Sequence, residues 1–366
     1  MKGFSWQAAL EKVRRLLLTG DWSTKLWEYV VRRLFMLVFV VIGVTMITFV
    51  LSQVLLDPVV LYLTEKTPDD AIAVIVAHYH LNDPWPVRYG VFLWNLILGD
   101  WGYSRTSSQP VLQALAERFP ATAELAIATV IWTLIAGIPF GIVSALRNNE
   151  LPDHVSRLVA LTGVSTPVFW LGLLLQLVFF YYFHLLGWPN LPSSGRYDTN
   201  LMINHPNMQV TGFMILDSVV TGNFTMTQDL LTHLILPSFT LGFTFIGVIM
   251  RIMRSSMLEV LRQDYVVLAR SKGLSERIVL YRHALKNAMI PTLTVAGLAF
   301  AGLLGGAPLA EMVFQWPGIG TLAVRGMGRN DSGLILGFTL MISLILVLVN
   351  LAVDILYVYL DPRIRY

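Results

Sequence analysis

Cysteine is absent from this chain, and charged residues are scarce. With no cysteine among 366 residues, disulfides, thiolate metal sites and cysteine nucleophiles are all excluded. Only 13% of the residues are charged, against about a quarter in an average globular domain. Intrinsic disorder is excluded as well, because 55% of the residues are hydrophobic. The mean hydropathy of +0.64 indicates that lipid is a large part of the solvent of this chain.

The sequence patterns of several enzyme classes are also missing. There is no G-x-x-x-x-G-K-[ST] phosphate loop, no H-E-x-x-H and no G-x-S-x-G. His78 and His80 are two residues apart and would lie on different faces of a helix, so a metal pair is not favoured. The chain is therefore expected not to be an enzyme, and to hold no catalytic residue, metal or cofactor of its own.

Uncharged stretches provide the fold class. A helix needs roughly 20 apolar residues to cross a bilayer, and six stretches qualify. They are residues 34–56, 125–146, 158–186, 230–250, 288–310 and 333–353. The sequence thus predicts an all-α membrane protein with six transmembrane helices.

The basic residues between these stretches predict the orientation. Segments 1–33, 147–157, 251–287 and 354–366 hold 19 Lys and Arg residues, and the alternate segments hold 7. Basic residues gather on the cytoplasmic side of a membrane. Both termini are therefore expected in the cytoplasm, and the net charge of +3 requires no nucleic acid to explain it.

The segments outside the spans differ in character. Residues 1–33 are expected to form an amphipathic cytoplasmic arm, with a partly ordered tail as the alternative. In segment 57–124, Thr67-Pro68-Asp69-Asp70 predicts a helix start, with the helix running to about His78 and a second one beginning near Pro86. Residues 187–229 show no clear fold signal.

A few residues within the spans call for separate interpretation. Glu124 opens the second span and Asp354 closes the sixth, and anchoring of a helix end is favoured over a proton relay at both. The Gly137-x-x-x-Gly141 pair and the glycines at 302, 305 and 306 are expected to allow close packing between helices.

Loop 251–287 is polar, basic and helical in pattern. Leu258, Leu261, Tyr265 and Leu268 are spaced as one apolar stripe, Gly273 suits a helix end, and Ser275 can cap the next helix. Two short amphipathic helices would then meet at residues 272–275 and project from the membrane. The pattern fits equally well a basic loop held to anionic lipid.

Residues 264–277, DYVVLARSKGLSER, resemble the coupling loop of binding-protein-dependent ABC transporter permeases. Five further stretches resemble the dipeptide and oligopeptide subfamily in particular. They are Tyr281–Pro291, Gly305–Gly318 with its E-x-V-F-x-W-P-G, Arg118–Leu125 with R-x-P-A-T-x-E-L, and Gly99–Ser104, together with the terminal D-P-R-I-R. The broader family signature has Glu-Ala-Ala where this chain has Val267, Leu268 and Ala269, and this departure is usual for the peptide subfamily.

The resemblance implies a type I ABC importer fold, with a permease core at 125–366, and a location in a prokaryotic plasma membrane. It implies three kinds of partner besides lipid: a second homologous permease, two ATPase subunits that bind ATP and magnesium, and an external solute-binding protein. The loop would couple the chain to the ATPases through the apolar side chains of Leu268, Ala269 and Leu274 and the charges of Arg270, Lys272 and Arg277, with Gly273 and Ser275 shaping the corner.

The resemblance also implies the import of dipeptides or oligopeptides. Relatives that carry oligosaccharides or nickel chelates leave the substrate open, and the residues that line its path are not identified by the sequence. A proton-coupled secondary transporter is less favoured, because ionisable residues deep in the spans are almost lacking. A channel is the remaining alternative.

Overall fold

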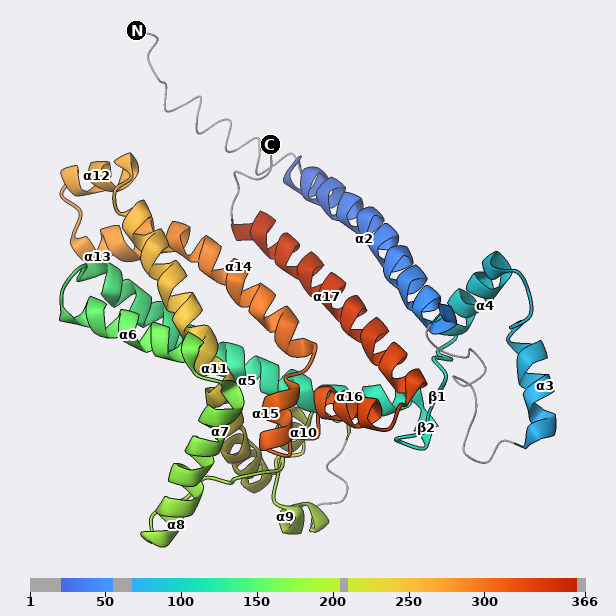
Figure 1. Cartoon of the computed structure of the whole chain (residues 1–366). Coiled ribbons are helices and arrows are strands. Elements are labelled where there is room, and N and C mark those ends of the chain that lie inside the picture. Colours follow the sequence, from blue (N-terminus) through green and yellow to red (C-terminus); the bar gives the residue numbers. More distant parts are fainter. Residues whose placement is uncertain (1–20, 55–67, 205–209, 361–366) are drawn as a thin grey trace.

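The computed structural model describes residues 21–54, 68–204 and 210–360, which are mostly helical (Figure 1). Six helical stretches in this part of the chain are long and apolar enough to cross a membrane, which confirms the predicted number of spans. Five long helices carry them in large part: α2 (Asp21–Val54), α5 (Val111–Leu146), α11 (Phe224–Val260), α14 (Leu285–Leu304) and α17 (Ser332–Leu360).

The remaining span is built from short pieces. α7 (Val168–Gln176) continues through a π-helical segment, Leu177–Tyr182, into α8 (Phe183–Leu185). The predicted span 158–186 was continuous, but the structure breaks it at Thr166 and Pro167, where α6 (Leu151–Ser165) ends. The backbone of Thr166 is extended, as expected of a residue that precedes proline.

α11 and α5 form the centre of the bundle (Figure 1). α6 and α14 pack against α11, α17 packs against α14, and α2 packs against α17 on the outside. Small residues bring the central helices together: a Cβ atom on Gly141 would lie 2.7 Å from the Cβ of Met253, and one on Gly137 would lie 2.7 Å from Ile249. The expected close packing at this glycine pair is confirmed. In the second group, a Cβ on Gly302 would meet no atom within 4 Å, but one on Gly305 would lie 3.3 Å from Ile342 and one on Gly306 would lie 3.0 Å from the Cα of Gly320.

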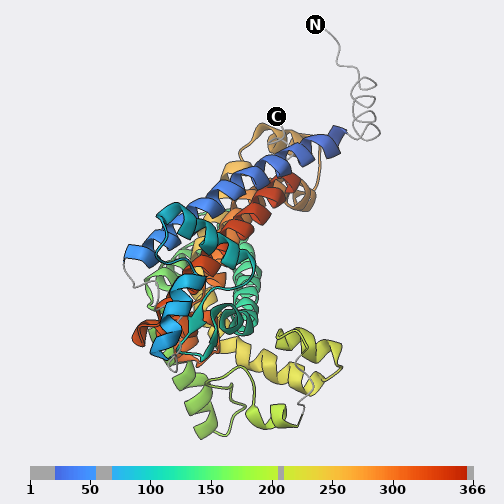
Figure 2. The ribbon, with the colours of Figure 1, turned by 90° about the vertical axis from the view of Figure 1, so that its right-hand side faces the viewer.

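The connecting segments divide between the two ends of the bundle. α12 (Asp264–Ser271) and α13 (Glu276–Ile278) lie at the same end as the start of α2 and the end of α17 (Figures 1 and 2). This grouping agrees with the alternation of basic and less basic segments. Which end faces the cytoplasm stays a prediction from charge.

The other end carries the long outer segments. α3 (Asp69–His78) ends where the sequence predicted, and α4 (Trp85–Ile97) follows it. Two short strands, β1 (Tyr103–Ser104) and β2 (Gln109–Pro110), pair antiparallel before α5. Segment 187–229, for which the sequence gave no fold signal, contains α9 (Thr199–Ile203) and α10 (Met214–Val220).

Several boundaries differ from those expected. α5 begins 14 residues before the predicted span, so Glu124 lies inside this helix instead of opening it. α14 ends at Leu304, and the chain turns at Gly305–Ala307 into α15 (Pro308–Val313) and α16 (Ile319–Gly328). Residues 1–20 of the predicted arm lie outside the described residues, and residues 21–33 form the first part of α2.

Candidate functional site

The loop between α11 and α14 is a small folded unit. Its first helix, α12, is separated from α11 by a turn at 261–263, and its second, α13, continues through a π-helical segment, Val279–Ala284, into α14. The predicted pair of short helices meeting at a corner is therefore present. The predicted stripe of Leu258, Leu261, Tyr265 and Leu268 is not a single helix face, because the turn at 261–263 interrupts it. The π-helical segment shifts the helical register between α13 and α14.

A buried base holds this unit together. Val266, Ala269 and Val279 are buried and pack against Val260, Leu261 and Tyr265. The hydroxyl of Tyr265 also accepts a hydrogen bond of 2.7 Å from the side-chain amide of Asn287. Ala269 was predicted to contact a partner; at 5% exposure it belongs to the base instead, because α12 turns this face towards α13.

The tip of the unit is exposed and combines apolar and basic side chains. Every residue from Arg270 to Ile278 is exposed, which includes the predicted Lys272 and Arg277. Leu268 on α12 is 55% exposed, and Leu274 at the corner is 36% exposed. Arg270 is directed to its own chain, where its Nε lies 2.8 Å from Glu276 Oε1.

The corner itself depends on Gly273. Its φ of +74° lies in the left-handed region, and its amide donates to the carbonyl of Arg270 at 2.9 Å. α12 thus ends with glycine where the sequence placed it. Ser275 occupies the predicted N-cap position of α13, but its hydroxyl makes no capping hydrogen bond; its carbonyl accepts the first bond from Val279 instead.

A second group of sequence motifs meets at the opposite end. Glu311 on α15 is buried, and its two carboxylate oxygens accept hydrogen bonds from the Thr122 hydroxyl at 3.0 Å and from the Thr321 amide at 2.7 Å. The Thr122 hydroxyl in turn accepts from the amide of Ile319 at 2.9 Å. Burial raises the pKa of the Glu311 carboxyl, an effect that these hydrogen bonds partly oppose.

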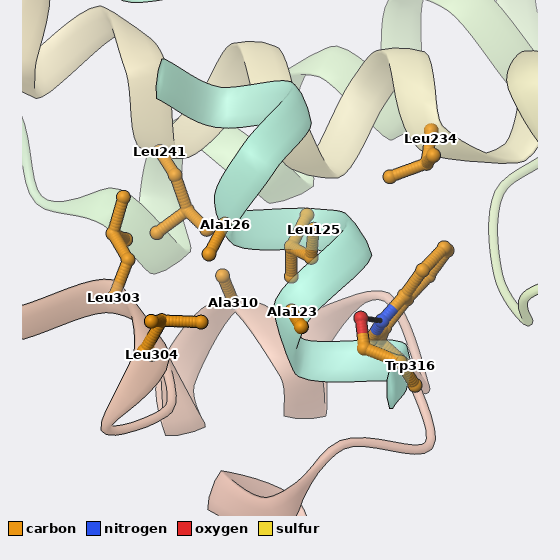
Figure 3. Close-up of a cluster of buried hydrophobic side chains, with 10 residues drawn as sticks. Ala123, Leu125, Ala126, Leu234, Leu241, Leu303, Leu304, Ala310 and Trp316 are labelled. Carbon is orange, nitrogen blue, oxygen red and sulfur yellow. Dashed lines mark hydrogen bonds between the residues drawn. The ribbon is translucent and has the colours of Figure 1, made fainter. Parts of the chain in front are cut away.

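Trp316 completes this junction. It is buried in the largest core cluster, and its indole N–H donates to the carbonyl of Ala121 at 2.8 Å (Figure 3). The stretches 118–125 and 305–318, far apart in the sequence, therefore form one structural joint between α5 and the α15–α16 segment. Their side chains bind each other, which indicates a structural role.

Gly318 at this joint offers a stability test. A Cβ atom on Gly318 would lie 2.5 Å from Glu311 Cδ and from Thr122 Oγ1. We expect Gly318→Ala to destabilise the protein by about 1–3 kcal/mol through overpacking, measured as a lower thermal unfolding midpoint in detergent. Gly328→Ala is the matched control, because a Cβ there meets no atom within 4 Å. Equal midpoints for the two variants would contradict the tight joint.

Comparison with known proteins identifies the family. Residues 137–366 match the family described as "Binding-protein-dependent transport system inner membrane component", and residues 26–126 match its N-terminal companion. The chain belongs to this family. It is 41% identical to the dipeptide transport system permease protein of Alkalihalophilus pseudofirmus over 339 residues, which cover 92% of this chain and 99% of that relative.

Two further relatives cover the chain to the same extent. Identity is 42% with the "Probable D,D-dipeptide transport system permease protein" of Escherichia coli, over 92% of this chain and 97% of the relative. It is 36% with the glutathione transport system permease protein of Salmonella choleraesuis, over 93% of this chain and 99% of the relative. The fold is accordingly that of an ABC permease, a multi-pass protein of the inner membrane.

The permease has a buried ion pair that the sequence did not reveal. Arg196, the one basic residue of segment 187–229, donates to Glu124 Oε2 from Nη2 at 2.6 Å and from Nε at 3.1 Å. The other oxygen of Glu124 accepts from the amide of Ile215 at 2.9 Å, and Arg196 also donates to the carbonyl of Gly212. Glu124 therefore holds the outer segment to α5, which favours the anchoring role over the proton relay.

Two aspartates fasten the β1–β2 region of the permease. Asp331, just before α17, accepts from the Ser104 hydroxyl at 2.8 Å and from the Thr106 amide at 2.7 Å. Asp100 accepts from the Tyr79 hydroxyl at 2.6 Å and from the Gly102 amide at 3.1 Å. The Gly99–Ser104 motif is thus a structural turn as well. No cluster of three or more potential metal ligands occurs among the described residues.

A groove of about 560 Å³ lies between α5 and α11. Its walls are mostly apolar, with Trp132 and Ile135 on α5 and Leu231 and Ile235 on α11. The polar residues that line it are Thr227, Gln228, Thr232 and Ser238. None of the lining residues is ionisable, so this groove offers no site for proton transfer.

Proposed function

We propose that the permease forms, with a second homologous permease, the translocation path of an ATP-driven importer of short peptides. The observation that carries this proposal is the folded loop 251–287, an exposed tip of apolar and basic side chains on a buried base. Relatives named for dipeptides, D,D-dipeptides and glutathione support a peptide substrate. Oligosaccharides and nickel chelates remain the alternative substrates.

In this mechanism two ATPase subunits bind the loops of the two permeases from the cytoplasm. ATP binding closes the ATPases and moves both loops, the bundle opens outward, and hydrolysis reverses the change. Leu268 and Leu274 enter an apolar groove of the ATPase, and Lys272 and Arg277 meet acidic groups at its rim. Apolar anchors inside a charged rim are the usual arrangement of the strongest contacts in an interface.

The buried base explains why the loop can transmit motion. Val266, Ala269 and Val279 hold α12 and α13 in one arrangement, so a force on Leu268 moves the loop as a unit. A loop bound only to anionic lipid needs positive charge but no such base. The packed base therefore favours an ATPase contact over a lipid contact.

The decisive experiment is purification of the tagged permease in mild detergent, followed by mass spectrometry and reconstitution. We expect a second permease and ATPases in the preparation, and uptake of labelled dialanine that requires ATP and the external binding protein. Excess unlabelled dipeptide should compete, whereas an oligosaccharide or a nickel chelate should not. Uptake by the purified chain without ATPases would contradict the proposal and favour a channel or a secondary carrier.

A further inference from the structure

Asp153 is a fully buried carboxylate that none of the sequence motifs contains. It lies in the first turn of α6, and it accepts hydrogen bonds from the Ser144 hydroxyl at 2.6 Å and from the Asn149 amide at 2.9 Å. The guanidinium groups of Arg157 and Arg254 bind both of its oxygens. Hydrogen bonds from Arg157 and Arg254 hold the pKa of Asp153 far below its usual range, so the group is ionised at any physiological pH.

Besides Arg157 on its own helix, Asp153 has partners from three other elements. Ser144 belongs to the last turn of α5, Asn149 to the turn between α5 and α6, and Arg254 to α11. Arg254 donates to Asp153 from Nε at 2.7 Å and from Nη2 at 2.9 Å, and Nη2 also donates to Asn148 Oδ1 at 2.7 Å. This bidentate pair, with two parallel hydrogen bonds, fixes the orientation of the guanidinium group relative to the carboxylate as well as their distance.

This junction lies close to α12 and α13, the short helices that we assign to ATPase coupling. Arg254 precedes the end of α11 at Val260 by six residues, and loop helix α12 begins four residues later. Next to Arg254, Met253 and Met257 are buried with Ala145 of α5 and with Ala284 and Ala288, where the chain returns from the loop. Both ends of the loop therefore pack at the junction.

The two arginines differ in what they connect. Arg157 is four residues from Asp153 on the same helix, and its Nη2 also donates to Asn149 Oδ1 in the preceding turn at 3.0 Å, so it neutralises the carboxylate without joining α6 to α11. Arg254 is the partner that crosses from α11 to the α5–α6 turn. Apolar contacts alone let helices slide over each other, but a bidentate ion pair with a buried acceptor does not.

We propose that Asp153 and Arg254 form a latch that makes the α5–α6 turn follow the coupling loop. Both are positioning residues: they bind groups of the permease itself and act by keeping the ends of α5, α6 and α11 in one arrangement. The latch rests on the proposed function, since it transmits movement that the ATPases produce. Without it, the loop would move while α5 and α6 lag behind.

The test is the coupling ratio, the labelled dialanine imported per ATP hydrolysed by the reconstituted full complex. We expect Arg254→Gln to keep at least half of the ATPase activity and to lower the ratio at least fivefold. Arg157→Gln is the matched control: it removes one arginine from the same carboxylate and should keep the ratio within twofold of wild type. Equal losses in the two variants, or an unchanged ratio in Arg254→Gln, would overturn the latch.

Arg254→Lys is a second variant for the case in which the Arg254→Gln permease does not assemble into the full complex. Lysine retains the positive charge but cannot make the bidentate pair, so the ratio should lie between those of Arg254→Gln and wild type. A lysine complex with the wild-type ratio would overturn the latch. Failure of the proposed function is distinguishable, because the wild-type complex itself would then lack ATPases or import dialanine without ATP.

Discussion

Leu268→Asp should release the ATPase subunits from the permease. Leu268 is exposed on α12 beside the basic tip, and in the proposed complex a carboxylate at this position would be buried against the ATPase groove. The loss of a central apolar anchor typically costs 2 kcal/mol or more, so we expect association at least about 30-fold weaker. Copurification of the ATPases with the tagged permease, quantified by mass spectrometry, measures the effect.

Ile203→Asp is the control for this substitution. Ile203 on α9 is 70% exposed and lies at the opposite end of the bundle, so its replacement should leave the ATPases bound. A second variant, Gly273→Pro, changes the corner without adding charge: proline fixes φ near −65°, whereas Gly273 requires +74°. Stoichiometric ATPase in both the Leu268→Asp and the Gly273→Pro preparations would show that this loop is not the contact.

Arg196→Met should destabilise the permease more than Gly318→Ala does. It leaves the buried carboxylate of Glu124 without its counter-charge, and breaking one partner of a buried ion pair costs about 3–5 kcal/mol. Segment 187–223 should then detach from α5, because the bond between Arg196 and Gly212 is lost as well. The thermal unfolding midpoint in detergent measures the loss.

The double variant Glu124→Gln with Arg196→Met separates charge from packing. It removes both charges, and the glutamine carbonyl can still accept from the amide of Ile215. We expect much of the lost stability to return, because replacing both members of a buried pair is often nearly neutral. No recovery would indicate that lost packing causes the destabilisation.

Loss of the exposed Arg270–Glu276 pair, by contrast, should change stability by less than about 1 kcal/mol.

Features set by local sequence were predictable here. The six spans follow from uninterrupted apolar stretches, the end of α12 from Gly273, and the end of α3 from the residues around His78. Interruptions were harder to see. Thr166-Pro167 splits the third predicted span, although membrane helices often continue through a proline. The π-helical segment 279–284 contains no proline or glycine, so nothing in the sequence indicated its register shift.

Polar contacts over long separations could not be found from one sequence. Arg196 and Glu124 are 72 residues apart, and Arg254 and Asp153 are 101 residues apart. Taken alone, Arg196 is a cation in a loop and Arg254 is a basic residue near the membrane. Glu124 and Asp153 are acids near the ends of predicted helices. One signal was available, since a lone arginine in a segment otherwise without basic residues suggests a specific acidic partner.

The burial of Ala269 could not be predicted either, because it depends on how α12 packs against α13.

The length of α11 turns small rotations into large displacements. The helix contacts α10 near its start and carries Arg254 and the loop at its end, and Pro237 lies inside it. Helices bend most readily at proline, so Pro237 is the natural pivot. The arm from Pro237 to Val260 is about 35 Å long at 1.5 Å per residue, and a tilt of about 10° moves its tip by about 6 Å. In the proposed complex α11 would act as a lever, and the position of its pivot would set how far an ATPase must pull.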